Sequence, residues 1–330
     1  MNSSYSNQKN ALELLLKLNL QFCSFLQFSK NVSLIFSLIF GVSQLKGQDC
    51  TGTPNPGATT STVPSPIAPG FGFTLGIANA QAGAGITYQW RTSTDGTNYS
   101  NIIGATNSTY AVPDGIFSKT YYRCYLQCTK TNTQAWSTPL QMNVQTQTTI
   151  GSQIWMSKNL GATTFRNGDP IPQAKTEVEW NTACQNQQPA WCYYNNDGAN
   201  GTKNGKLYNW YAVKDARGLA PAGWHIPSDA EWTTLTNTLG TGYASGKMKS
   251  ANGWFRSGNG NNSSGFSGYP GGNREYTGAF TLFGEYGIWW SGTESSPGYI
   301  WNRKLYYNYT LVYRLKSLSN EGLSVRCVKD

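Results

Sequence analysis

Residues that serve metal-dependent and acid–base catalysis are scarce in this sequence. His225 is the only histidine among 330 residues, and the seven cysteines include no CxxC pair. A zinc site and a histidine-cluster iron site are therefore not expected. His225 lies between Trp224 and Ile226, a setting that favours a structural hydrogen bond over a Ser–His–Asp unit assembled from distant segments.

Charge is also sparse, and the sequence contains no basic run. Asp, Glu, Lys and Arg together make up 12% of the residues, and the formal net charge is +9. Nucleic-acid grooves combine clustered basic residues with aromatic residues, whereas the basic residues here are spread singly. Nucleic acid is therefore not an expected partner, and we interpret the charge as an aid to solubility.

The apolar run at residues 32–42 is too short to span a bilayer. Lys30 precedes it, and Ser43 and Gly47 offer cleavage points after it, which is the pattern of a signal peptide. Residues 1–48 are interpreted as a leader, so we expect a secreted or cell-surface protein without a stable transmembrane segment after cleavage. The first 29 residues are unusual ahead of such a signal, and either a misassigned start or a long n-region explains them.

Glycine, asparagine and aromatic residues are abundant, which favours many short strands and turns. Residues 49–66 are rich in Pro, Gly, Ser and Thr and read as an extended lead-in. Short strand-like runs separated by turn signals fill residues 67–145, a pattern typical of a β-sandwich. The expected strands are residues 73–77, 86–93, 109–112, 120–128 and 139–144.

Two side chains link this first domain to a known class. Trp90 lies where an immunoglobulin-like strand carries its core tryptophan, and Tyr122 stands two residues before Cys124, as in a tyrosine corner. The segment thus resembles the immunoglobulin-like modules of exported bacterial adhesins and enzymes, which usually act as spacers or presenters. The strand order of that class implies that Cys50 meets Cys128, which leaves Cys124 unpaired, buried or otherwise partnered.

A polar stretch at residues 146–149 reads as a hinge, and a second domain is expected from residue 150 to residue 330. The apolar face of GKLYNWYAVKDARG, residues 205–218, predicts a helix. A second helix is expected from Ser228 to about Leu239, because Ser228 and Glu231 form a capping box and Gly240 follows. A long loop region at residues 250–284 and four strand-like runs complete the domain.

The second domain closely resembles the Fibrobacter succinogenes major paralogous domain, a module common in exported Bacteroidetes proteins. The matching text includes IWMSKNL, RNGDPIP, CYYNND, GKLYNWYAV, RGLAPAGWHIPSDAEW, GGNRE, WWSGTES and GLSVRCVKD. Family members often carry a cysteine where this chain has Ala220. A disulfide through that position is therefore not implied for this chain, and Cys327 is expected to pair with Cys184 or Cys192 or to stay free.

A more distant resemblance implies the fold. NWYAV, IPSDAEW and the closing GLSVR are similar to the formylglycine-generating enzymes, which have a C-type-lectin-like fold with long display loops. The expected fold class is a multidomain protein, in which an all-β immunoglobulin-like sandwich precedes an α+β C-type-lectin-like domain. Those enzymes need a cysteine pair that acts through copper near the domain end, where this chain offers Cys327 alone. The catalytic interpretation therefore fails, and the protein is not expected to be an enzyme.

Aromatic and charged residues near the expected display loops are candidates for ligand binding. Tryptophans could stack on sugar rings, with Tyr299 and Tyr306 nearby, although alternate residues of a strand must face the core. Arg274, Glu275 and Arg303 are expected to be exposed and so are favoured over any single tryptophan. The full set of candidates is Arg274, Glu275, Trp290, Glu294, Trp301 and Arg303.

An oxygen-rich loop at Asn195, Asn196 and Asp197 could hold calcium. With a single carboxylate, the alternative that these residues simply make turns is favoured. No other cofactor is expected.

These features together predict an exported, non-catalytic binding or adhesion protein. Its expected partner is a surface glycan or a protein, bound through the second domain while the first serves as a stalk. Two alternatives remain, an enzyme of unknown reaction on the same fold and a structural component of the envelope or matrix.

Overall fold

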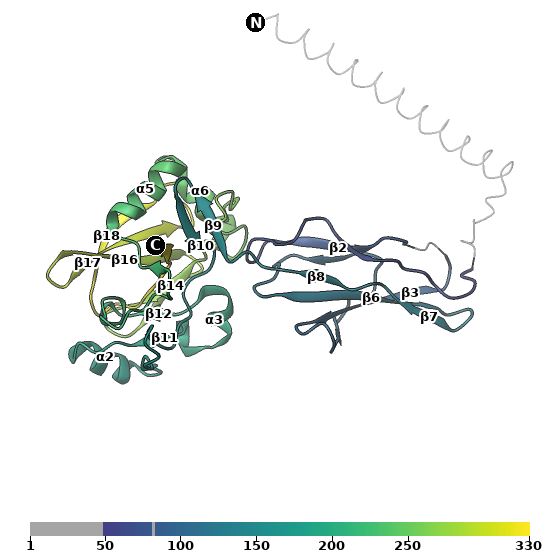
Figure 1. Ribbon diagram of the computed structural model, residues 1–330, viewed down its shortest axis with the longest axis horizontal. Helices are drawn as coiled ribbons and strands as arrows, with labels where there is room; N and C mark the ends of the chain where they lie inside the picture. The colour runs from purple at the N-terminus through teal and green to yellow at the C-terminus, as the bar shows by residue number, and fades with distance from the viewer. Residues whose placement is uncertain (1–48, 81–82) are drawn as a thin grey trace, which may run out of the picture.

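Two β-rich bodies follow one another along the long axis of the molecule (Figure 1). The structure is a computed structural model, and it describes residues 49–80 and 83–330. The predicted signal peptide lies outside these residues. Within the described ranges, no helix is long and apolar enough to cross a membrane.

The first body consists of two antiparallel sheets that enclose one apolar core. One sheet has the order β1-β2-β5, and the other has the order β4-β3-β6-β7 with β8 also paired to β6. The predicted strands are confirmed with small shifts at their ends. The strands are β1 (Thr59–Ser61), β2 (Phe73–Ile77), β3 (Ile86–Ser93), β4 (Ser100–Asn101), β5 (Tyr110–Val112), β6 (Thr120–Cys128), β7 (Thr133–Trp136) and β8 (Leu140–Met142).

Trp90 lies at the centre of this core and is fully buried. It stands opposite Cys124 in the β3–β6 register, and Leu75 approaches from the other sheet. The predicted Cys50–Cys128 disulfide is confirmed, and it ties the lead-in segment to the end of β6. Cys124 is a free thiol, and burial raises its pKa to about 12.

The second body is built around a six-stranded sheet of order β11-β12-β19-β16-β17-β18, accompanied by a four-stranded sheet of order β13-β20-β10-β9 and the hairpin β14–β15. Its strands are β9 (Gln147–Ile150), β10 (Gln153–Met156), β11 (Trp191–Cys192), β12 (Leu207–Tyr208), β13 (Trp224–His225), β14 (Gly271–Arg274), β15 (Phe280–Phe283), β16 (Tyr286–Ser296), β17 (Tyr299–Tyr306), β18 (Tyr313–Leu318), β19 (Leu323–Ser324) and β20 (Val328–Lys329). Its helices are α2 (Glu177–Gln185), α3 (Ala199–Asn204), α4 (Trp210–Val213), α5 (Asp229–Leu239) and α6 (Ala244–Met248), with 3-10 turns η1 (Tyr194–Asn196) and η2 (Phe255–Ser257).

The helix predicted over residues 205–218 is confirmed only in its middle, at residues 210–213. Leu207 and Tyr208 form strand β12, which pairs with β11 and β19 in the central sheet. Only residues 210–213 are helical, and the Asn209 side chain caps them by accepting a hydrogen bond from Ala212 N at 3.0 Å. The apolar spacing was misleading because both faces of the segment are buried, so its periodicity does not distinguish a strand from a helix.

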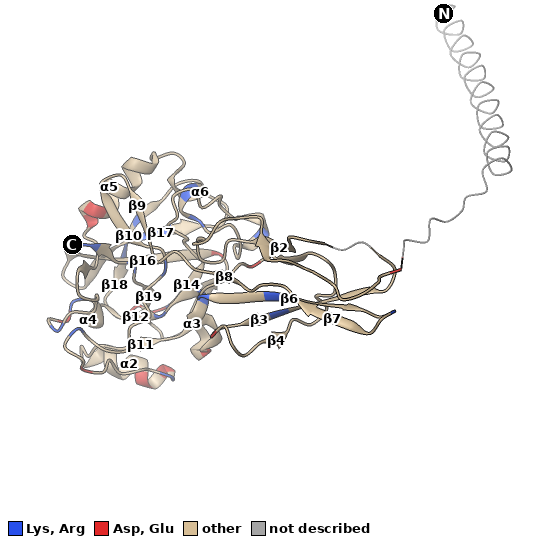
Figure 2. Cartoon of the chain, turned by 45° about the vertical axis from the view of Figure 1, so that its right-hand side comes forward, with Lys and Arg blue, Asp and Glu red and all other residues tan. Residues whose placement is uncertain are grey.

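Helix α5 confirms its predicted start and end. Ser228 Oγ accepts a hydrogen bond from Glu231 N, and Glu231 accepts one from Ser228 N at 2.8 Å, which completes the capping box. Trp232, Leu235 and Leu239 are the buried face. Acidic residues occupy the first turns of both α2 and α5 (Figure 2). Their negative charges interact favourably with the positive end of the helix dipole.

Arg303 is buried beneath the start of α5, so the prediction that it is exposed is wrong. Its side chain is 2% exposed and donates to Asp229 Oδ1 at 2.7 Å. Arg314, which is much more exposed, donates to both oxygens of the same carboxylate, from Nε to Oδ1 at 2.9 Å and from Nη2 to Oδ2 at 2.9 Å. Burial lowers the pKa of Arg303, and Asp229 supplies the charge that keeps this guanidinium stable away from water.

Replacing Asp229 with Asn should destabilise the protein by about 3 kcal/mol, because it leaves the buried Arg303 without a counter-charge. Urea unfolding of the variant measures this loss. Asp215→Asn is the matched control, since its partner Arg217 is well exposed, and its free energy of unfolding should barely change. Equal effects of the two substitutions would contradict this account of the Arg303 site.

His225 makes the kind of hydrogen bond predicted for it, through both ring nitrogens. Its Nδ1 lies 2.7 Å from Asp330 Oδ1 and its Nε2 lies 2.7 Å from Glu231 Oε1. The ring thereby joins the start of α5 to strand β20, which also pairs with β13. Partial burial lowers the pKa of His225, but the hydrogen bonds to the two carboxylates outweigh burial and the net pKa is raised.

The raised pKa makes the contribution of His225 depend on pH. It is fully present below the ordinary His pKa of 6.5 and is lost as pH rises through the folded-state pKa. The pKa of Glu231 is lowered, so its own contribution is lost as pH falls through that value. The destabilisation caused by His225→Gln should therefore be larger at pH 6 than at pH 9 in matched urea titrations, and the reverse order would refute it.

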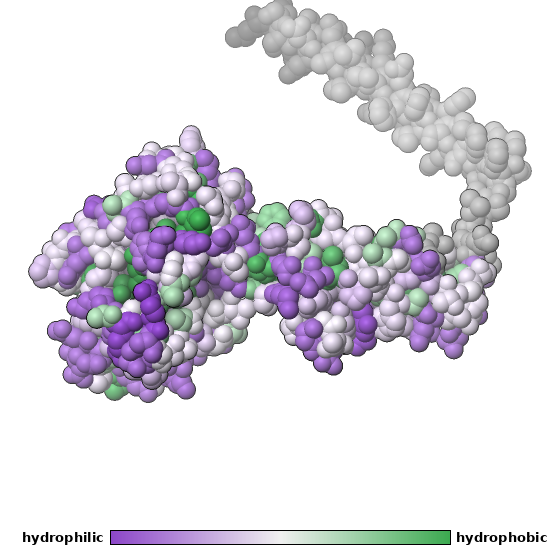
Figure 3. Space-filling model, in the orientation of Figure 1, coloured by the Kyte–Doolittle hydropathy of each residue, from purple (hydrophilic) through white to green (hydrophobic). Residues whose placement is uncertain are grey.

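Contacts between the two bodies involve the loop around Pro69 and Gly70. Tyr269 Oη donates to Pro69 O at 3.1 Å, and Asn252 Nδ2 donates to Gly70 O at 2.8 Å. Figure 3 shows apolar residues gathered near this junction. The segment predicted as a hinge, residues 146–149, contributes three residues to strand β9 instead, because they pair with β10.

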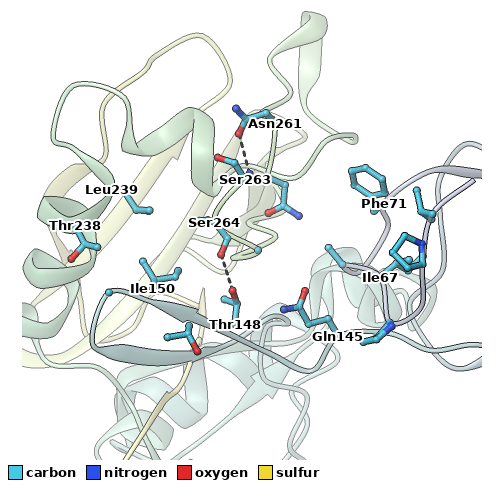
Figure 4. Close-up of a pocket in the computed structure, with 18 residues that line it drawn as sticks. Ile67, Phe71, Gln145, Thr148, Ile150, Thr238, Leu239, Asn261, Ser263 and Ser264 are labelled. Atoms are coloured by element: carbon cyan, nitrogen blue, oxygen red, sulfur yellow. Dashed lines mark hydrogen bonds between the residues drawn. The ribbon is translucent and has the colours of Figure 1, made fainter.

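A hollow of about 700 Å³ lies at the junction (Figure 4). Ile67 and Phe71 come from the first body, and Ile150 and Leu239 from the second. Thr148 Oγ1 donates to Ser264 O at 2.8 Å within its wall. Residues of both bodies therefore line this hollow.

Candidate ligand-binding groove

An open groove of about 540 Å³ lies between α2, α4 and the loops at one end of the central sheet. This volume is typical of small-ligand sites. Its lining residues are Asn181, Cys184, Gln185, Tyr211, Tyr276, Thr277, Gly298, Tyr299, Leu318, Ser319 and Asn320.

Helix α2 forms one wall, and local chemistry fixes where it starts. Thr176 and Glu179 make a capping box, so the helix begins at Glu177. Trp180 is fully buried and its Nε1 donates to Asn320 O at 3.0 Å. The anchored helix therefore presents Asn181 and Gln185 toward the groove.

The opposite side of the groove is made of short loops that hydrogen bonds hold together. Ser319 N donates to Gly298 O at 3.2 Å, and Trp210 N donates to Ser319 O at 3.1 Å. The hydroxyls of Tyr211 and Ser319 lie 3.2 Å apart. Asn181 Nδ2 donates to Thr277 O at 3.3 Å, which links α2 to the β14–β15 turn. The loops are thus fixed before any ligand binds.

Two tyrosines stand exposed at the groove. Tyr276 is 57% exposed and lies in the β14–β15 turn, and Tyr299 is 46% exposed at the start of β17. Exposed aromatic rings offer flat apolar faces with a polar tip. In the part of the chain that the structure describes, no charged side chain lines this groove.

The lining is rich in amide and hydroxyl groups. Amide and hydroxyl groups both donate and accept hydrogen bonds, which suits a neutral ligand with many hydroxyls. Cys184 is the one thiol among the lining residues, and burial raises its pKa. Such a thiol is held in its unreactive protonated form.

All residues that line the groove lie within a segment that matches a known protein family. The sequence model of the Fibrobacter succinogenes major domain matches residues 148–329. The chain belongs to this family. A second model, Domain of unknown function (DUF8696), matches residues 72–146 in the first body. No curated protein matches the chain.

Within the Fibrobacter domain, Arg274 is buried, so the prediction that it is exposed is wrong. The residue is 1% exposed. Its guanidinium donates to Gly278 O at 2.9 Å, Ala174 O at 3.1 Å and Thr176 O at 2.8 Å. These bonds join the turn that carries Tyr276 to the segment that starts α2. Arg274 thus positions two walls of the groove from beneath.

Trp290 is also buried in the Fibrobacter domain. It is fully buried in the core, and its Nε1 donates to Tyr208 O at 2.8 Å. Trp301 is half-buried, and the Arg314 guanidinium lies 3.4 Å from its ring centroid. That cation already occupies a face on which a sugar was expected to stack.

The two acidic candidates lie beside the groove. Glu275 is half-buried, accepts a hydrogen bond from Thr281 Oγ1 at 3.1 Å and directly precedes Tyr276. Glu294 is exposed and accepts one from Gly298 N at 3.1 Å, next to Tyr299. Both carboxylates therefore support turns that carry groove tyrosines.

Sequence reasoning missed most of the groove lining. Tyr276 lies in the loop region expected to display ligands, and Tyr299 was named as a neighbour of the sugar-stacking residues. The sequence did not mark Asn181, Gln185 or Tyr211 as groove residues. They line the groove because the tertiary fold brings α2 and α4 to this end of the sheet.

The loop predicted as a calcium site makes turns in the structure. Asn195 and Asn196 have φ values of 51° and 56°, the left-handed conformation that asparagine tolerates. Asp197 Oδ1 accepts a hydrogen bond from Ala199 N at 2.9 Å. Calcium binding at this loop stays a prediction.

The three disulfide candidates of the Fibrobacter domain, Cys184, Cys192 and Cys327, are free buried thiols, so those pairings are corrected. Cys327 packs in the core cluster that contains Trp290, whereas the other two pack in the cluster beneath α2. Cys327 therefore packs in a different core from Cys184 and Cys192, its expected disulfide partners.

Proposed function

We propose that this protein is an exported, non-catalytic binding protein whose C-terminal domain holds a neutral glycan in the groove. The observation that carries the proposal is the lining itself, in which exposed Tyr276 and Tyr299 accompany the amides of Asn181, Gln185 and Asn320. Tyrosine rings pack against the C–H faces of sugars, and amides bind their hydroxyls.

We also propose that the two bodies are an immunoglobulin-like sandwich and a C-type-lectin-like domain. Support for the first comes from the two-sheet core and from Trp90 opposite Cys124. Support for the second comes from helices α2 and α5 placed against a small, mostly antiparallel sheet. In this proposal the sandwich is a stalk that presents the groove away from its point of attachment.

Export and a surface location are supported by the Cys50–Cys128 disulfide, since such bonds persist in oxidising compartments. The partner is then a glycan or a glycosylated protein outside the cell. An enzyme on the same fold and a structural envelope component are the competing proposals. Measurements of glycan binding and of glycan turnover distinguish them.

A glycan array probed with the full-length protein should detect neutral oligosaccharides. Tyr276→Ala and Tyr299→Ala should each weaken binding about tenfold, because each removes one stacking face. Tyr243→Ala is the control, since Tyr243 is 75% exposed and does not line the groove. Titration calorimetry on the best array ligand measures the change.

Absence of binding to every neutral glycan would overturn the proposal, and so would equal losses in the control and groove variants. Turnover of a bound glycan into products would replace it with the enzymatic alternative.

A further inference from the structure

Four tyrosines pack together on the central sheet at the opposite end of β17 from Tyr299. We call Tyr286, Tyr306, Tyr309 and Tyr313 the tyrosine cluster. Ring centroids lie 4.5 Å apart for Tyr286 and Tyr306, 5.4 Å for Tyr306 and Tyr309, and 4.8 Å for Tyr306 and Tyr313. Tyr309 is 49% exposed, so the cluster reaches the surface.

Lys304 lies against this cluster, with its ammonium near two of the rings. Its Nζ is 5.4 Å from the Tyr286 ring centroid and 5.8 Å from that of Tyr306. Among the described residues, none accepts a hydrogen bond from this ammonium or pairs with it within 4.0 Å. Burial lowers the pKa of Lys304. A partly desolvated ammonium with three unused donors is a strong site for an anion.

The side-chain amide of Asn302, which lies nearby, has an oxygen without a hydrogen-bond partner among the described residues. Asn302 is two residues before Lys304 on β17, so both side chains face the same side of the sheet. It is 1% exposed, and its Nδ2 donates to Ser317 Oγ at 3.0 Å. Its buried Oδ1 has no hydrogen-bond partner in the described chain, which is uncommon for a buried amide.

Glu321 is the carboxylate whose charge acts on Lys304, but its oxygens are already engaged. Oε2 accepts from Ser317 Oγ at 3.0 Å and Oε1 accepts from Leu318 N at 3.0 Å. Burial raises the pKa of Glu321. The site therefore keeps its capacity for an incoming anion.

We propose that Lys304 and the tyrosine cluster form a second ligand site that binds a carboxylate-bearing sugar. Lys304 pairs with the carboxylate, and the tyrosine rings cover an apolar face of the pyranose. A hydroxyl or water that enters with the ligand supplies the donor that Asn302 lacks. A simple carboxylate would use the ammonium alone, whereas an acidic sugar uses both the charge and the rings.

This site is separate from the groove and does not rest on the proposed function. Tyr299 and Lys304 are five residues apart on one strand, about 17 Å at the usual rise. Loss of binding at either site therefore leaves the other measurable.

Titration calorimetry with methyl glucuronide and methyl glucoside on the full-length protein tests the proposal. The two probes differ only at C6, where the glucuronide carries a carboxylate and the glucoside a hydroxymethyl group. The glucuronide should therefore bind at least about tenfold more tightly, and its affinity should fall as salt rises. Lys304→Met should abolish this preference, and Lys304→Arg should keep it. Lys316→Met is the matched control, because Lys316 lies on the neighbouring strand over Trp301, and it should bind as the original protein does.

Equal affinity for the two probes, or binding of neither, would overturn the proposal. A preference that survives in Lys304→Met would also overturn it. Salt dependence is measured on the unaltered protein, so a salt-independent glucuronide affinity would count against the ion pair even if the Met variant failed to fold.

Discussion

Neighbouring tryptophans on β16 divide the interior of the C-terminal domain. Trp289 and Trp290 point to opposite faces of the strand, as successive residues must, and both are fully buried. Trp289 packs in the core that includes Trp155 and α5, and Trp290 packs in the core that includes Tyr208 and Leu323. A single strand thereby fixes two cores, and a register shift of one residue would exchange their contents.

The groove and the tyrosine cluster depend on this arrangement. β17 pairs with β16 along its length, so its two ends are held in place by the same pair of cores. The groove lies at one end and the tyrosine cluster at the other. The ligand binding proposed for both sites needs side chains on rigid supports, and buried tryptophans provide such a support.

Local chemistry was readable in the sequence. The capping box of α5 involves residues three apart, and the strands of the first domain alternate in burial, so neither depends on distant contacts. The Fibrobacter resemblance was also visible in continuous text, and the family match confirms it. The burial of charged side chains could not be predicted from the sequence. Arg274 and Arg303 resemble exposed arginines in the sequence, and only carbonyl oxygens and a carboxylate brought from far along the chain allow them to be buried.

Strand β10 pairs on one side with β9, its neighbour in sequence, and on the other with β20, near the end of the family segment. Trp155 thus meets Val328 across almost the whole domain. Contacts of such long sequence separation form late, since a large loop must close first. The same pairing places the two ends of the domain side by side, a geometry that lets a module be inserted into a longer chain without disturbing its neighbours.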